Sequence, residues 1–115
     1  MGEKHSDIAA YYTNIGTVYD FCLKFEKALK YHEKALYIGL EVLGEEHPNV
    51  GTIYNNIGLS YKSLGEFEKA QESYEKALKI MLKVFGENHP HSAKTYNNIG
   101  VVYKSLGKFE QALKY

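Results

Sequence analysis

The chain repeats itself with a period of 42 residues. The segment YNNIGLSYKSLG at 54–65 returns as YNNIGVVYKSLG at 96–107, with ten of twelve positions identical. A looser copy, YTNIGTVYDFCL, occupies 12–23. The period divides the chain into three units, the last of them incomplete: 2–43, 44–85 and 86–115. Because a unit of this length buries its apolar face mainly against its neighbours, we expect one continuous stack of like units over 1–115.

Each unit is predicted to contain two α-helices. In the middle unit Ile53, Ile57 and Tyr61 recur every three or four residues, which is the period of one helix face. A second apolar stripe with the same period runs from about Phe67 to Phe85. The pattern therefore predicts successive pairs of helices and an all-α fold.

A short connector recurs with the units, as GEEHP at 44–48, GENHP at 86–90 and an opening copy, GEKHS, at 2–6. Its glycine is expected to end one helix. Its proline is expected to begin the next, because the first turn does not need the missing N–H. We expect His47 and His89 to contact the first turn of the helix that follows. In the opening copy Ser6 replaces proline, and serine is a favourable N-cap, so a helix is expected to begin there.

Glycine also recurs within the units. Gly65 is expected to end the first helix of the middle unit and to let the chain turn. Gly16, Gly58 and Gly100 each fall inside a first helix, where glycine costs about 1 kcal/mol relative to alanine. Because this cost recurs at one position of every unit, we predict that a neighbouring helix approaches closely there.

The first unit departs from the other two. Leu23 stands where they have Gly65 and Gly107, so its turn is expected to use a different cap. His32 replaces Tyr74 in the second helix. These departures favour the first unit as the end of the stack where local unfolding begins.

The middle unit carries a recognisable pattern, Tyr54-x-x-Ile57-Gly58-x-x-Tyr61, then Ala70-x-x-x-Tyr74 and Ala77. It resembles the tetratricopeptide repeat. The 42-residue period and the long second helix look like the long-helix subclass found in kinesin light chains and nephrocystin-type proteins. The resemblance implies a right-handed superhelical solenoid of antiparallel helix pairs, with about 2.7 repeats of 42 residues in a single array.

The resemblance also implies that the first helices line a concave groove that binds a protein or an extended peptide. The groove positions carried over from the family are Thr13, Asn14, Thr17, Thr52, Asn55, Asn56, Leu59, Lys62, Lys94, Asn97, Asn98, Val101 and Lys104. In the family, the asparagine found here as Asn14, Asn56 and Asn98 commonly hydrogen-bonds the main chain of the ligand. An amide suits that task because it offers both donors and an acceptor. Alternatively, these amides cap or bridge the backbone of neighbouring helices.

One version of the family binds the terminal carboxylate of chaperones through a clamp rich in lysine and arginine. Lys94 matches one position of that clamp. Thr13 or Asn55 stands at its upstream lysine position, and Asn98 stands at its final arginine position. The groove is therefore polar with few fixed charges, and we do not expect a receptor for chaperone tails.

The composition excludes several other classes of function. Fourteen basic residues balance fourteen acidic ones, which argues against nucleic acid as a partner because phosphate binding needs a basic face. No apolar run reaches the roughly 18 residues of a membrane helix, and the start lacks a signal peptide, so a cytoplasmic location without membrane contact is expected. A single cysteine, Cys22, excludes an intramolecular disulfide, and we expect it to be half-buried and inert.

No catalytic residue, metal site or cofactor is predicted. His89 and His91 are the only close pair of histidines, and no motif joins a nucleophile to a base or forms a phosphate loop. Histidines in equivalent connectors are separated by a whole helix pair, hence by roughly 10 Å or more. Zinc bonds nitrogen at about 2.0–2.1 Å, so one ion cannot gather them.

The third unit favours a second hypothesis, self-association. Its second helix begins as FEQALKY and stops at Tyr115, so the stripe of Ile99, Tyr103 and Leu106 is expected to be partly uncovered. Uncovered apolar surface at the end of a repeat array drives association. A homo-oligomer formed by end-to-end stacking or helix exchange is therefore an alternative function. The other explanation is that Tyr115 lies inside a longer natural array.

Overall fold

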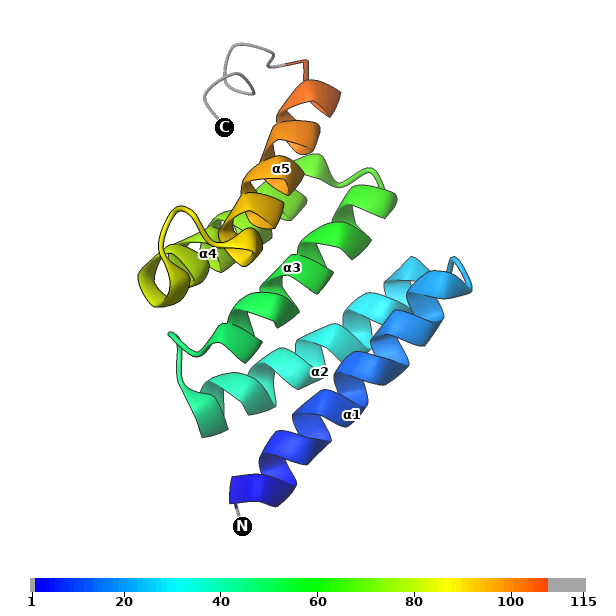
Figure 1. The fold of residues 1–115 in the computed structure, drawn as a ribbon. Helices are drawn as coiled ribbons and strands as arrows, with labels where there is room; N and C mark the ends of the chain where they lie inside the picture. Colours follow the sequence, from blue (N-terminus) through cyan, green and yellow to red (C-terminus); the bar gives the residue numbers. More distant parts are fainter. Residues whose placement is uncertain (1, 108–115) are drawn as a thin grey trace.

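The computed structural model describes residues 2–107, with side chains from residue 7 onward. These residues form five α-helices and no strand: α1 (Gly2–Phe21), α2 (Phe25–Leu43), α3 (Pro48–Ser63), α4 (Phe67–Phe85) and α5 (Pro90–Ser105). Each helix packs against the next along the chain, and the pairs α1–α2 and α3–α4 are antiparallel hairpins (Figure 1). The predicted all-α fold of stacked helix pairs is confirmed, as is the span of the second helix of the middle unit.

The connectors begin and end the helices as expected. Gly44 and Gly86 follow the last residues of α2 and α4, and Pro48 and Pro90 are the first residues of α3 and α5. Gly65, in the turn after α3, has φ +80°, in the left-handed region that glycine enters without a steric penalty. The residues that interrupt the helical periodicity in the sequence are therefore the ones that shape the turns.

The turn after α1 corrects the expectation of a different cap. Leu23 has φ +63°, so a leucine adopts the left-handed conformation that glycine adopts at Gly65. The backbone N–H of Lys24 donates to Tyr19 O at 2.9 Å, and the equivalent bond in the middle unit has the same length. The packing of α1 on α2 requires this turn, and the leucine is held in a conformation that costs roughly 1–2 kcal/mol.

The start of α1 corrects a second expectation. The helix begins at Gly2, four residues before the serine that was expected to cap it. Ser6 therefore lies within the helix, and the opening GEKHS does not form a connector. The physical reason is that proline forces a helix boundary by lacking an N–H, whereas serine only favours one.

The glycines inside the first helices make room for rings, as predicted. A Cβ on Gly16 would lie 2.6 Å from the imidazole of His32, and a Cβ on Gly58 would lie 2.6 Å from the ring of Tyr74. Among described residues no atom lies within 4 Å of the equivalent point at Gly100. In the third unit the segment that would supply the ring lies beyond residue 107, outside the described residues.

The core consists of apolar clusters between consecutive helices. One cluster joins α4 to α5 through Ala70, Tyr74, Leu78, Ile99 and Val102, and a second joins α2 to α3. Ile99 is completely buried against α4, so the expectation that it is partly uncovered is wrong. It faces backward onto the preceding helix, whereas Tyr103 and Leu106 are half-buried at the edge of the same cluster.

Cys22 is exposed in the turn after α1, which corrects the expectation of a half-buried thiol. Its apolar sequence neighbours Phe21 and Leu23 are themselves 84% and 74% exposed and do not cover it.

Within residues 2–107 no helix has the length and apolar character needed to cross a membrane.

Candidate peptide-binding surface

The three equivalent asparagines lie at one position of each first helix. Asn14 on α1 is exposed, and Asn56 on α3 and Asn98 on α5 are half-buried. Asn56 and Asn98 each precede an isoleucine that is buried in the core, Ile57 and Ile99, whereas Ile15 after Asn14 is half-buried. Within the part of the chain that the structure describes, none of the three side chains forms a hydrogen bond.

Asn55 behaves differently, because it bridges two helices. Its Nδ2 donates to Thr95 Oγ1 at 3.1 Å, which joins α3 to α5. The hydroxyl of Thr95 in turn donates to His91 O within α5 at 3.1 Å. Asn55, one of the predicted groove residues, therefore links two first helices of the fold. Asn97, at the equivalent position of α5, is exposed.

The groove threonines are engaged with their own helices. Thr13 and Thr17 donate to the carbonyl oxygens of Ala9 and Thr13 at 3.0 Å, and Thr52 donates to Pro48 O at 3.3 Å. A threonine hydroxyl in such a bond keeps acceptor capacity but no free donor. These side chains therefore offer less to a ligand than the asparagines do.

The remaining groove positions supply charge and apolar contact. Lys94 and Lys104 on α5 are exposed, and Lys62 on α3 is half-buried. Leu59 and Val101 occupy equivalent positions on α3 and α5 and are 45% and 37% exposed. The surface therefore combines amides, short apolar patches and positive charge toward the second and third units.

A polar cluster that the sequence analysis missed joins the first three helices. The side chain of Asp20 accepts a bond from His32 Nε2 at 3.0 Å and another from Ser60 Oγ at 2.9 Å. His32 is completely buried, whereas Asp20 is one-fifth exposed. A comparison of the repeat units could have indicated this cluster, because the middle unit has lysine and tyrosine where the first unit has Asp20 and His32. Since the carboxylate separates the hydroxyl from the imidazole, this is not the arrangement of a serine nucleophile with its base.

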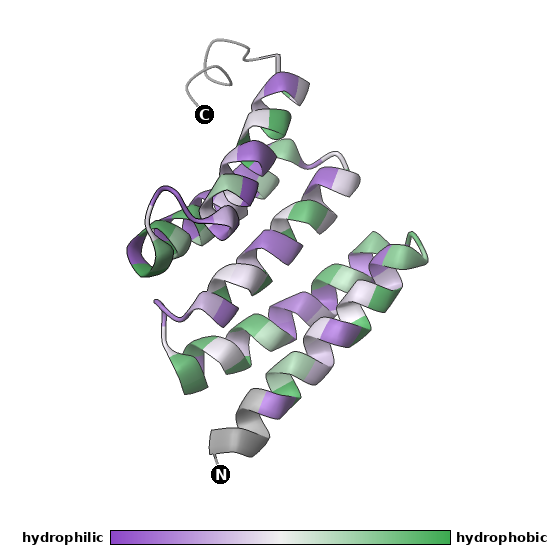
Figure 2. Cartoon of the chain, viewed as in Figure 1, coloured by the Kyte–Doolittle hydropathy of each residue, from purple (hydrophilic) through white to green (hydrophobic). Residues whose placement is uncertain are grey.

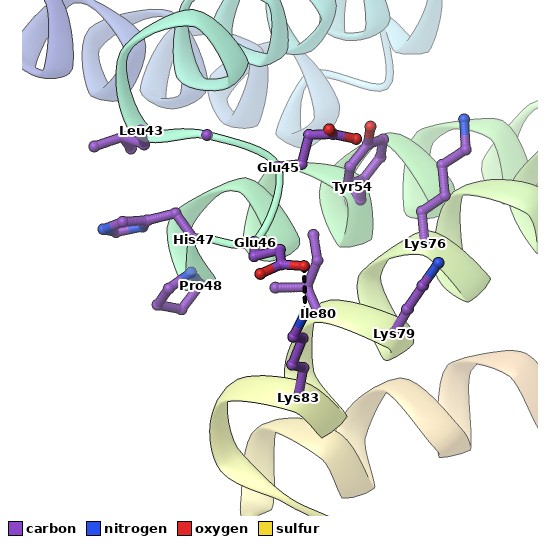
Figure 3. A pocket seen from close by; sticks show the side chains of 11 residues that line it. Leu43, Glu45, Glu46, His47, Pro48, Tyr54, Lys76, Lys79, Ile80 and Lys83 are labelled. Atoms are coloured by element: carbon purple, nitrogen blue, oxygen red, sulfur yellow. Dashed lines mark hydrogen bonds and ion pairs between the residues drawn. The ribbon is translucent and has the colours of Figure 1, made fainter.

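A cleft of about 840 Å³ opens between the α2–α3 connector and α4. Figure 3 shows the lysines of α4, Lys76, Lys79 and Lys83, across from Glu45 and Glu46 of the connector. Lys83 forms an ion pair with Glu46. Charges of both signs compensate one another here, so the cleft does not concentrate either charge for a small ionic ligand.

The connector histidines serve the fold, as predicted. Nδ1 of His47 accepts the N–H of Asn49 at 3.0 Å, and Nδ1 of His89 accepts the N–H of His91 at 3.1 Å. Each therefore caps the first turn of its helix. In the part of the chain that the structure describes, no three His, Cys, Asp or Glu side chains gather in a way that would hold a metal ion.

Known proteins share the sequence pattern and the fold of this chain. The sequence matches the model of a tetratricopeptide repeat family over residues 7–83 and again over 52–115. BtubC (BKLC) from P. vanneervenii has a solved structure that is 33% identical and superposes with a TM-score of 0.82. That match covers 90% of this chain and 42% of the other. No curated protein sequence matches.

Two further structures share the fold at lower identity. A kinesin-light-chain-type protein of Podospora anserina with nearly identical TPR-like repeats is 19% identical, with a TM-score of 0.83 over 96% of this chain and 52% of that one. The TPR domain of FLU from Arabidopsis is 18% identical, with a TM-score of 0.82 over 99% of this chain and 90% of that one. The chain thus spans about half or less of the first two structures.

Proposed function

The chain belongs to the tetratricopeptide repeat family, and from this premise we propose that it is a non-catalytic module that binds an extended peptide across α1, α3 and α5. Repeats of this family generally mediate interactions between proteins. The observation that carries the peptide proposal is the set of three unbonded amides, Asn14, Asn56 and Asn98, one on each first helix. Their shared position in the repeat supports a ladder of contacts rather than three unrelated surface residues.

The arrangement of the first helices suits an extended ligand. Hydrogen bonds link successive first helices, from Ser60 to Asp20 and from Asn55 to Thr95. A peptide that crosses the first helices in an extended conformation presents backbone groups to each amide in turn, because an extended chain leaves its N–H and C=O groups free along its length. Each amide can donate to a peptide carbonyl and accept from a peptide N–H.

Charge supports a preference within this class of ligand. Lys62, Lys94 and Lys104 lie on α3 and α5. On α1 the carboxylate of Asp20 is occupied by its bonds to His32 and Ser60. A ligand with acidic residues toward the second and third units is therefore favoured over a basic one.

The experiment begins with a displayed library of random peptides selected on the 115-residue chain. The tightest peptide is then measured by calorimetry against a variant with Asn14, Asn56 and Asn98 all changed to alanine. Each lost bond is expected to cost roughly 0.5–1.5 kcal/mol of binding free energy. The control is Asn88→Ala, because Asn88 is exposed in the α4–α5 connector, away from the first-helix row. A selected peptide that binds the triple variant as tightly as the original chain would remove the groove assignment.

A further inference from the structure

The connector between α4 and α5 brings three rings together. His89 stacks on Phe85, the last residue of α4, with ring centroids 4.1 Å apart. His91, in the first turn of α5, has its ring centroid 5.0 Å from that of His89 and 5.1 Å from that of Phe85. Figure 2 shows that the loop between α4 and α5 is hydrophilic, and His91 is exposed. Two adjacent imidazoles are therefore accessible to protons from solvent.

One of these imidazoles holds the start of α5. Nδ1 of His89 accepts the backbone N–H of His91 at 3.1 Å. A neutral imidazole has one nitrogen that accepts a hydrogen bond, whereas both nitrogens of the protonated ring are donors. Protonation of His89 therefore removes the cap. It also places a positive charge at a helix N-terminus, where the helix dipole disfavours it.

The equivalent connector between α2 and α3 has the same cap without the second histidine. Nδ1 of His47 accepts the N–H of Asn49 at 3.0 Å, and Asn49 stands where the other connector has His91. Asparagine does not titrate, whereas two protonated imidazoles repel each other. Of these two connectors, the one before α5 therefore combines the loss of a cap in acid with a pair of like charges.

Charged side chains from the adjoining elements act on these rings. Lys83, in the last turn of α4, is paired with Glu46 of the preceding connector. Glu87 lies in the α4–α5 connector and is exposed, so water screens its attraction for an imidazolium. Lys94 of α5 adds a positive charge, whereas the face of the Phe85 ring attracts a cation. These attractions offset part of the cost of protonation, and the lost cap, the helix dipole and the like charges remain.

We propose that residues 86–91 form an acid-sensitive hinge, in which protonation of His89 and His91 loosens α5 from α4. An imidazole in water is half-protonated near pH 6.5. Because the cap requires a neutral ring, the stability that it contributes is present at pH 7.5 and is lost as the pH falls toward 5.5. Ser92 Oγ still donates to Gly86 O at 2.7 Å, a bond that does not titrate. The expected change is therefore a local opening of α5.

The hinge would regulate one unit of the array. Helix α5 carries Asn98 and Lys94. A partner that contacts these side chains should therefore bind less tightly at pH 5.5 than at pH 7.5. The hinge does not rest on the proposed function, because the contacts that support it lie within the connector and the first turn of α5.

Amide hydrogen exchange of the 115-residue chain, followed by NMR and corrected for the intrinsic effect of pH, tests the hinge. The protection of residues 95–102 in α5 is expected to fall at least about fivefold between pH 7.5 and pH 5.5, the factor that one lost cap represents. His89→Asn should abolish most of this fall, because asparagine is a good N-cap that does not titrate. Both chains keep His32, so protonation of that ring affects them alike. Protection that does not fall in the original chain, or that falls as steeply in His89→Asn, overturns the proposal.

Two further variants separate the contributions of the cap and of the second charge. His91→Asn gives this connector the asparagine found at position 49, so the fall in protection of α5 should become at least about twofold smaller. His47→Asn makes the same change in the other connector and should leave the fall in α5 unchanged. Far-ultraviolet circular dichroism at pH 7.5 verifies that each variant remains helical. A fall that His91→Asn leaves undiminished, or that His47→Asn abolishes, overturns the hinge at this connector.

Discussion

The Nε2 atom of His32 lies 3.0 Å from Oδ2 of Asp20, and this contact joins the two helices of the first unit. A carboxylate only accepts hydrogen bonds, so the imidazole is the donor. The other oxygen of Asp20 accepts from Ser60 on α3, which extends the link into the second unit. One carboxylate therefore holds together α1, α2 and α3, next to a turn in which Leu23 is strained.

Removal of this carboxylate is expected to destabilise the first unit. Asp20→Ala leaves the completely buried His32 without its partner and should cost roughly 1–3 kcal/mol in the free energy of unfolding, as measured in urea. The control is Asp7→Ala, since Asp7 is an exposed aspartate on the same helix and should change stability by less than about 0.5 kcal/mol. Equal effects of the two substitutions would show that the bonded cluster contributes nothing to stability.

The helices of the fold were predictable because the same pattern of apolar residues, glycines and prolines recurs in successive units. A period that recurs with the same prolines and glycines predicts α3, α4 and α5 to within a residue, since proline and glycine restrict the backbone whatever surrounds them. The opening copy has no proline, and there the expected boundary at Ser6 was wrong. Local signals thus predicted the boundaries that are enforced sterically and missed the one that is only favoured.

The contacts between units were less predictable. The bond between Asn55 and Thr95 joins residues 40 positions apart, and no pattern within one unit indicates it. The cluster of Asp20, His32 and Ser60 depends on departures from the repeat that matter only when they meet in space. The turn at Leu23 was also not predictable from the residue itself. The packing of two helices imposes a left-handed conformation there that leucine disfavours.

Leu23→Gly is expected to stabilise the chain. The substitution relieves a left-handed conformation that costs leucine roughly 1–2 kcal/mol, and part of that gain is offset by the greater freedom of glycine in the unfolded chain. A net gain of about 0.5–1 kcal/mol should appear in urea unfolding. Leu64→Gly is the matched control, because Leu64 caps α3 with φ −82° and gains no relief. If Leu23→Gly destabilises the chain as Leu64→Gly does, the left-handed strain at Leu23 is absent.

Alanine should have opposite effects at two equivalent glycines. At Gly58 the added Cβ would lie 2.6 Å from the ring of Tyr74, and overpacking of this kind costs about 1–3 kcal/mol. At Gly100 no described atom lies within 4 Å, so Gly100→Ala should gain up to about 1 kcal/mol from helix propensity. Thermal unfolding of both variants provides the comparison. Similar shifts of Tm in the two variants would mean that the ring does not set the requirement for glycine.

Tyr74→Phe is expected to be neutral or stabilising. The hydroxyl of Tyr74 is completely buried and has no hydrogen-bond partner among the described residues, so folding removes it from water without compensation. Phenylalanine keeps the ring that packs over Gly58 and removes the unsatisfied group. A loss of more than about 1 kcal/mol in urea at neutral pH would show that the hydroxyl has a partner in solution.

The same substitution should change how stability depends on alkaline pH. Burial raises the pKa of Tyr74 from 10.0 to about 12. Below pH 10 the tyrosine is protonated in both states, so it adds no pH dependence. Between about pH 10 and 12 it ionises in the unfolded chain but stays protonated in the folded one, so the folded state loses up to about 1.4 kcal/mol for each pH unit. Tyr74→Phe removes this contribution, so its stability relative to the original chain should rise across that range. Parallel curves of unfolding free energy for the two chains from pH 9 to pH 12 would contradict the raised pKa.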